Sequence, residues 1–202
     1  MEPAYALGME LPYAADILIG RPASGKETQA KLMKPHGFFH ISTGNMIHDI
    51  LDNDALKGTP QYGACLVIRK GNFISDELVQ SILEPEVARF IKEGDYDPQS
   101  MRALIEGYPR KVSQVPLSER IFDCGRVLYL DVPREVCIER QLNRDGDRED
   151  KDPVVAERRQ RVFDEETAPL LEHYKHVIRI DGTRSIEEIH KDIKDALIFP
   201  RF

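Results

Sequence analysis

The length, composition and charge of the chain exclude several classes of protein. It has 202 residues, of which 41% are hydrophobic and 31% are charged, and its formal net charge is −7 at pH 7. No apolar run approaches the ~18 residues that cross a bilayer, and an acidic chain lacks the dense positive surface that coats nucleic acid. We therefore expect a globular protein that has neither a membrane nor nucleic acid as a partner.

The amino-terminal residues and the cysteines favour the cytoplasm. Residues 1–15 lack the basic and continuous apolar segments of a signal peptide, and we interpret them as an N-terminal arm before a domain at 16–202. Cys65, Cys124 and Cys137 are widely spaced and form no metal-binding motif, so reduced thiols are the simplest interpretation. On these grounds we expect a cytoplasmic protein.

Short apolar runs alternate with helical patterns along the chain. The apolar runs lie at residues 16–20, 38–41, 102–106, 127–131 and 176–181. The helical patterns lie at residues 26–33, 43–51, 59–68, 76–91, 133–143, 153–174 and 185–197. Pro85 and Pro169 are predicted to bend or restart two of these helices. Strands separated by helices predict an α/β fold with a parallel five-stranded sheet, whose ligands bind beyond the carboxyl ends of the strands.

The first strand leads into a glycine-bounded loop and then into a helix. Residues 20–28 read Gly-Arg-Pro-Ala-Ser-Gly-Lys-Glu-Thr, which fits the pattern G-x-x-x-x-G-K. In such a P-loop, backbone N–H groups and the start of the helix face phosphate, and the lysine adds a positive charge near the transferred group. The position of the match, between the first strand and the first helix, favours a phosphate site over an ordinary turn. It predicts a P-loop nucleotide-binding, three-layer αβα fold.

Arginines are concentrated late in this acidic chain. They are Arg140, Arg144, Arg148, Arg158, Arg159 and Arg161. A planar guanidinium group holds two oxygens of a phosphate at once, so this segment indicates a protein that handles a small anion. We interpret Arg158 and Arg161 as solvent-exposed, because they match no motif.

Several ordered segments resemble adenylate kinases. Residues 20–29 are similar to the family's G-x-P-G-x-G-K-G-T-Q, residues 40–46 to H-I-S-T-G-D-M and residues 71–77 to G-x-L-V-x-D-E. Residues 105–110, Ile-Glu-Gly-Tyr-Pro-Arg, are similar to L-D-G-F-P-R, and Gln114 follows at the family's spacing. Residues 167–170 and 181–183 match the closing segments, so the resemblance covers about residues 16–197.

The resemblance implies both an architecture and a reaction. A helical insertion that binds a nucleoside monophosphate (NMP) is expected within residues 42–93, and a short lid at about 144–152. This lid lacks the Cys/His positions of zinc-carrying lids, so no zinc is expected. The implied reaction moves the γ-phosphoryl group of ATP, bound with Mg²⁺, to an NMP. We expect a monomer whose partners are ATP and that acceptor.

The resemblance also implies roles for individual residues. The catalytic residues would be Lys26, Arg110, Arg144, Arg148 and Arg159, with Arg110 and Arg159 on the acceptor phosphate and Arg144 and Arg148 on the transferred group. ATP would contact Gly20, Pro22, Ala23, Ser24, Gly25, Lys26, Glu27, Thr28, Arg140, Arg144, Thr183 and Arg184, with Arg140 over its base. The acceptor would contact Thr43, His48, Ile74, Gly107, Arg110, Gln114, Arg148 and Arg159. Glu106 would hold Mg²⁺ through water.

Four positions depart from the family pattern. Ala23 replaces a loop glycine, which is tolerable only if its φ is negative. Glu27 replaces a glycine and places a carboxylate where it either repels phosphate or helps to bind hydrated Mg²⁺. Glu106 replaces an aspartate and still suits Mg²⁺, and His48 replaces an arginine with a side chain that is neutral for much of the physiological pH range. These departures permit a slower or altered enzyme of the same fold.

The acceptor and the activity stay open between alternatives. Thr43 and Gln114 favour AMP, since UMP/CMP kinases, by the same resemblance, usually have a small residue at the first position and no Gln at the second. The main hypothesis is therefore the reaction ATP + AMP = 2 ADP. The alternatives are a UMP/CMP kinase, a catalytically weak nucleotide-binding protein, which Glu27 and His48 would explain, and a P-loop kinase for another small metabolite.

Overall fold

The sheet of the protein has the predicted parallel form. The computed structural model describes residues 12–144 and 151–198. The strands are β1 (Tyr13–Gly20), β2 (Phe38–Ser42), β3 (Arg102–Glu106), β4 (Phe122–Asp131) and β5 (Val177–Asp181). They form a five-stranded sheet in the order β2-β3-β1-β4-β5, and every pairing is parallel. β1 begins at Tyr13 and β4 at Phe122, earlier than predicted for both strands.

The helices follow the predicted alternation with the strands. They are α1 (Lys26–Leu32), α2 (Thr43–Asp52), α3 (Pro60–Cys65), α4 (Asp76–Glu93), α5 (Val115–Ser118), α6 (Arg134–Leu142), α7 (Pro153–Val162), α8 (Leu170–His173) and α9 (Ile186–Ile198). Pro85 lies inside α4, which continues past it as one helix. The helix predicted at 153–174 divides instead into α7, a π-helical turn at Phe163–Thr167 and α8, so the restart at Pro169 is confirmed.

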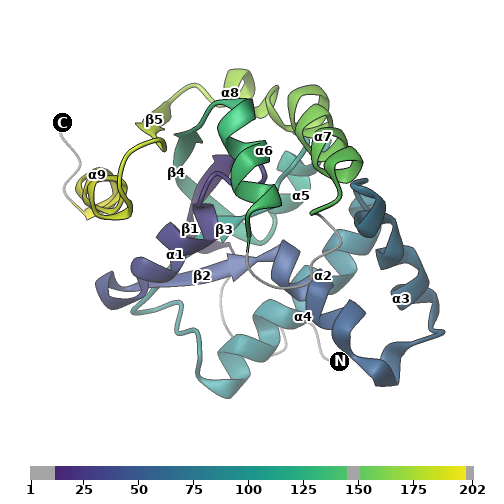
Figure 1. The fold of residues 1–202 in the computed structure, drawn as a ribbon. Helices are drawn as coiled ribbons and strands as arrows, with labels where there is room; N and C mark the ends of the chain where they lie inside the picture. Colours follow the sequence, from purple (N-terminus) through teal and green to yellow (C-terminus); the bar gives the residue numbers. More distant parts are fainter. Residues whose placement is uncertain (1–11, 145–150, 199–202) are drawn as a thin grey trace.

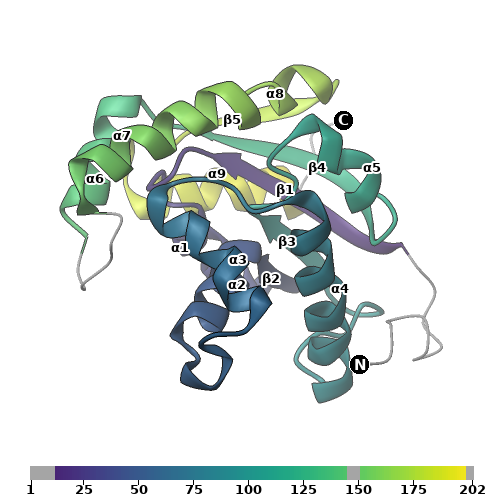
Figure 2. The same cartoon turned by 90° about the vertical axis from the view of Figure 1, so that its right-hand side faces the viewer.

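Helices cover both faces of the sheet, which gives three layers (Figures 1 and 2). On one face, α1 and α9 pack apolar side chains such as Ala30 and Ile193 against Leu104 and Leu128 of the strands. On the other face, α2, α3 and α4 cover β2 and β3, while α5, the π-helical turn and α8 cover β1 and β4. Within the described ranges, no helix is both long and apolar enough to span a membrane.

A buried ion cluster holds the amino-terminal half of the sheet. Asp16 of β1 is 0% exposed and accepts hydrogen bonds from Arg102 Nε (2.9 Å) and from the backbone N–H of Arg126 (2.9 Å). The register of β1 on β4 shifts at this point, between Ala15 and Asp16. Because a buried carboxylate is stable only when it is paired and hydrogen-bonded, we assign this cluster to folding. It lies at the end of the sheet opposite residues 20–28, the predicted P-loop, which we call the phosphate loop.

The carboxyl ends of the central strands converge at one edge. Register pairs Leu18 of β1 with Glu106 of β3, and Ser42 of β2 with the same Glu106. The loop that follows Gly20 therefore starts beside the ends of β2 and β3. Ser42 also begins α2, because its hydroxyl accepts the N–H of Asn45 at 3.3 Å as an N-cap.

Candidate active site

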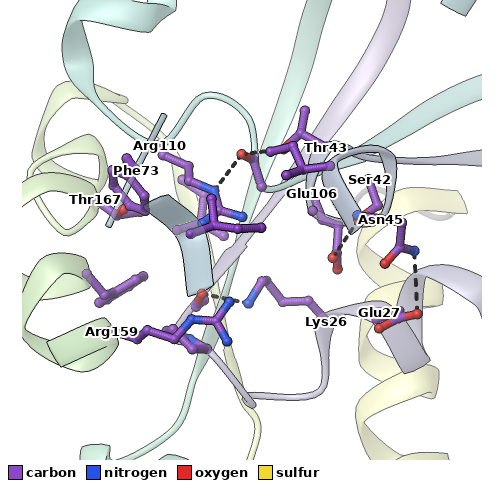
Figure 3. Close-up of a pocket in the computed structure, with 18 of the residues that line it drawn as sticks. Lys26, Glu27, Ser42, Thr43, Asn45, Phe73, Glu106, Arg110, Arg159 and Thr167 are labelled. Carbon is purple, nitrogen blue, oxygen red and sulfur yellow. Dashed lines mark hydrogen bonds between the residues drawn. The ribbon is translucent and has the colours of Figure 1, made fainter. Parts of the chain in front are cut away.

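A cavity of about 380 Å³ lies where these strand ends meet the loop after β1, α2 and α7. Of the residues predicted to bind nucleotide, the cavity is lined by Gly20, Pro22, Ala23, Gly25, Lys26, Glu27, Thr28, Thr43, His48, Ile74, Glu106, Gly107, Arg110, Gln114, Arg144 and Arg159. Its volume falls within the usual range for small-molecule sites. Figure 3 shows Lys26, Arg110 and Arg159 projecting toward the same space from different elements.

Lys26 is held inside the phosphate loop. Its Nζ donates to the carbonyl oxygens of Gly20 (2.7 Å) and Arg21 (2.8 Å) and lies 3.4 Å from Ser24 Oγ. The pKa of Lys26 is lowered to about 8, chiefly because its ammonium group is removed from solvent; Arg110 and Arg144 act in the same direction, and Glu106 opposes them. An anion in the cavity would reverse this shift, since it favours the charged form.

The backbone at Ala23 does not meet the condition of a negative φ that was set for an alanine at this position. Ala23 is not a glycine, yet its φ is +66°. The backbone N–H of Ser24 donates to Arg21 O at 3.1 Å, which closes a turn with Pro22 at its second position and Ala23 at its third. Proline followed by a positive φ is the pattern of a type II turn, which normally takes glycine at the third position. The turn therefore imposes a left-handed conformation on an alanine.

Arg110 and Thr43 are fixed by one carbonyl group on the other side of the cavity. Arg110 Nε and Thr43 Oγ1 both donate to Gly107 O at 2.8 Å, and the guanidinium of Arg110 lies 5.1 Å from the ring centre of Phe73. Gly107 has φ +77°, and a Cβ there would lie 2.9 Å from Thr43 Oγ1, so this turn requires glycine. Burial lowers the pKa of Arg110 to about 10, and Arg159 adds to the effect.

α7 brings Arg159 to the cavity and packs closely against Gly71. A Cβ on Gly71 would lie 3.2 Å from Arg159 Cγ and 3.4 Å from Val155 O, so Gly71 permits this close approach. Gln160 Nε2 also donates to Pro22 O at 3.2 Å, which ties α7 to the phosphate loop. Arg148, and with it most of the lid expected at 144–152, lies outside the described residues.

Glu106 has the chemistry needed to hold hydrated Mg²⁺. Its Oε1 accepts from Ser42 Oγ at 3.1 Å, whereas its Oε2 is buried and has no hydrogen-bond partner within the described part of the chain. His40 Nε2 is 3.8 Å from that oxygen, and burial lowers the pKa of His40 although Glu106 acts to raise it. A neutral imidazole leaves the carboxylate charge available. Oxygen ligands of this kind suit Mg²⁺, which usually keeps several of its waters.

Glu27 is engaged by two neighbouring side chains. Its Oε1 accepts from Lys31 Nζ at 2.7 Å, one turn along α1, and from Asn45 Nδ2 of α2 at 3.5 Å (Figure 3). Glu27 and His48 both line the cavity, so the two departures from the family pattern face the same space. The negative charge of Glu27 is thus partly compensated by Lys31.

Some predicted ATP contacts do not line the cavity. Ser24 is 1% exposed, and Arg140 Nη1 donates to Gly182 O at 3.1 Å and to Ser24 O at 3.4 Å, behind the phosphate loop. Thr183 is turned to Asp181, whose Oδ1 accepts its N–H (2.9 Å) and its hydroxyl (2.6 Å). Arg184 forms an ion pair with Asp192 of α9. Arg158 and Arg161 are exposed, as predicted.

The prediction of the site missed several residues that line the cavity. They include Ser42, Asn45, Phe73, Phe163 and Thr167. Ser42, Asn45, Phe73 and Thr167 lie within segments whose motifs were recognised, so their place in those motifs was a usable signal. Phe163 lines the cavity where α7 gives way to a π-helical turn, which periodicity does not reveal.

The amino-acid sequence of this chain is similar to those of known proteins. The chain matches the family described as adenylate kinase over residues 18–179. It is 32% identical to an adenylate kinase of Prochlorococcus marinus over 192 residues, which cover 90% of this chain and 97% of that protein. It is 30% identical to a uridylate kinase of Saccharomyces cerevisiae (89% of this chain, 88% of that protein) and 32% identical to a UMP-CMP kinase of Lentinula edodes (89% and 83%). This chain therefore belongs to the adenylate kinase family.

Proposed function

We propose that this protein transfers the γ-phosphoryl group of ATP, bound with Mg²⁺, to AMP and so forms two molecules of ADP. The observation that carries the proposal is the convergence of Lys26, Arg110, Arg144 and Arg159 on one cavity. The pKa values of Lys26 and Arg110 are both lowered in this protein without bound phosphate. Cations gathered at such a cost in electrostatic free energy indicate a site shaped for anions.

The reaction needs positioning and charge neutralisation, since charge spreads over the oxygens of the moving phosphoryl group. Lys26, on the phosphate loop, would hold the donor phosphates, and Arg144 the transferred group. Arg110 and Arg159 would hold the acceptor phosphate from the opposite side. Mg²⁺, held through water by Glu106, would neutralise charge on the donor phosphates when bound. Substrates that fill the cavity would displace water from it, which favours transfer over hydrolysis.

The choice of AMP rests on two residues at the acceptor side. The relatives include both adenylate and uridylate kinases at similar identity, so overall similarity does not decide the acceptor. Thr43 and Gln114 both line the cavity, and Gln114 is 2% exposed, which makes it a buried amide rather than an exposed helix residue. A buried amide at this place can read a base edge by hydrogen bonds.

A coupled assay of ADP formation with AMP, CMP, UMP, GMP and dAMP tests the proposal. We expect kcat/KM for AMP to exceed that for CMP by about tenfold or more, as loss of buried hydrogen bonds would predict. Thr43→Ala should lower this ratio. A ratio near one or below it in the unmodified protein would favour the UMP/CMP kinase alternative. No ADP above the uncatalysed rate with any acceptor would favour the weak nucleotide-binding alternative.

A further inference from the structure

The side chain of Gln114 is held at both ends by hydrogen bonds. Its Oε1 accepts the backbone N–H of Arg110 at 2.7 Å, and its Nε2 donates to Asp76 Oδ1 at 2.7 Å. Asp76 is the first residue of α4 and comes from the insertion, whereas Gln114 follows β3 in the core. A residue of the insertion thus fixes a side chain that lines the acceptor side of the cavity.

These two partners determine which way the amide points. The N–H of Arg110 can only donate, so the atom facing it must be the carbonyl oxygen of Gln114. The carboxylate of Asp76 accepts, so the atom facing it must be the NH₂ group. The orientation therefore follows from the chemistry of the partners. The amide keeps one N–H and one oxygen lone pair for a ligand.

We propose that Asp76 is a positioning residue for acceptor discrimination, because it holds the Gln114 amide in the orientation that reads the acceptor base. This inference rests on the proposed function and assigns a part in that function to a residue that does not itself line the cavity. Without Asp76, the NH₂ group of Gln114 would lose its partner, and the amide would be held only at its oxygen by the Arg110 N–H, so that it could turn about this remaining bond. The donor and acceptor presented to the base would then no longer be fixed.

Asp76 is itself held by neighbouring side chains. Its Oδ2 accepts from Ser113 Oγ at 3.0 Å, and Lys111 Nζ lies 3.6 Å from Oδ1. Ser113 contacts the oxygen of Asp76 that does not bind Gln114. This gives a matched control, since Ser113→Ala removes one bond of the carboxylate and leaves the bond to Gln114 intact.

The test compares the ratio of kcat/KM for AMP over CMP, together with the ratio of the two dissociation constants from calorimetry. We expect Asp76→Ala to lower both ratios by about tenfold, which corresponds to about 1.4 kcal/mol. Asp76→Asn keeps a carbonyl oxygen for Gln114 and should retain the ratios, and so should Ser113→Ala. Because each ratio is measured on one preparation, partial unfolding cancels. If Asp76→Ala does not fold, Asp76→Glu displaces the oxygen by one methylene and should also lower the ratios.

A double-mutant cycle shows whether Asp76 acts through Gln114. We expect Asp76→Ala to change neither ratio in a Gln114→Leu background, because the amide that it positions is absent. The inference is overturned if Asp76→Ala and Asp76→Glu leave the ratios unchanged, if Asp76→Asn lowers them as much as Asp76→Ala, or if the two effects are additive. An unmodified protein that phosphorylates no acceptor contradicts the proposed function instead, and the calorimetric ratio still tests Asp76.

Discussion

The left-handed conformation of Ala23 predicts that replacing it with glycine stabilises the protein. A left-handed conformation costs an ordinary L-residue about 1–2 kcal/mol, and Ala23 has φ +66° within the turn that Pro22 begins. Glycine removes this strain but loses more backbone entropy on folding, which offsets about 0.4–1 kcal/mol. The net gain for Ala23→Gly is about 0.5–1 kcal/mol. For a chain of this length, that raises Tm by about 1–4 °C.

Thermal unfolding of Ala23→Gly beside Ala64→Gly tests this reasoning. Ala64 is exposed within α3, where the same chemical change should lower stability by about 1 kcal/mol, since glycine is a poor helix former. The two substitutions are thus expected to change Tm in opposite directions, because the backbone conformation differs between the two positions. A fall in Tm for Ala23→Gly similar to that for Ala64→Gly would refute the claim that the loop is strained.

Three further predictions concern the charges in the cavity. Since the pKa of Lys26 is about 8, this side chain is neutral in roughly three quarters of the protein molecules at pH 8.5. Anionic phosphate favours its ammonium form. ATP binding at pH 8.5 should therefore be accompanied by the uptake of more than about half a proton per protein, which calorimetry in two buffers of different ionisation enthalpy measures. Lys26→Met should abolish this uptake and lower kcat by about a hundredfold. Equal proton uptake by the two proteins would contradict this prediction. His48→Arg should lower the AMP KM, because arginine adds a permanent positive charge where His48 lines the cavity. An unchanged KM would place this side chain away from the phosphate. Glu27→Gly should strengthen the binding of ATP in the absence of metal, because the positive charge of Lys31 beside the phosphate loop then loses its carboxylate partner. An unchanged ATP affinity together with a higher Mg²⁺ concentration at half-maximal rate would assign Glu27 to metal binding instead.

Much of the fold could be predicted because apolar runs and turn residues are local signals. The parallel sheet follows from the alternation of strands and helices. The beginning of β4 was hidden because Asp123 and Arg126 interrupt its apolar pattern. Arg126 is accommodated there because it pairs with Asp16, 110 residues away, and a pairing at that separation leaves no trace in local sequence.

The residues that line the cavity could be predicted where they belong to recognised motifs. They could be predicted less well where long-range contacts determine the orientation of a side chain. The bond between Asp76 and Gln114 joins residues 38 positions apart, and the spacing of Gln114 after Arg110 predicts only its proximity to the acceptor. The φ of Ala23 was left open by the sequence, and its positive value follows from the turn that Pro22 begins. Arg184 was expected to contact ATP, whereas in the structure its side chain pairs with Asp192 of α9.

Direct transfer of phosphate to AMP is the central claim, and following a labelled γ-phosphate tests it most directly. The unmodified protein and Lys26→Met are incubated with γ-labelled ATP, Mg²⁺ and AMP, and the labelled products are separated. We expect label to appear as the terminal phosphate of ADP formed from AMP, with two ADP formed per ATP consumed. Lys26→Met should slow this transfer by about a hundredfold. Label released as inorganic phosphate, or label that stays in ATP with the unmodified protein, would contradict it.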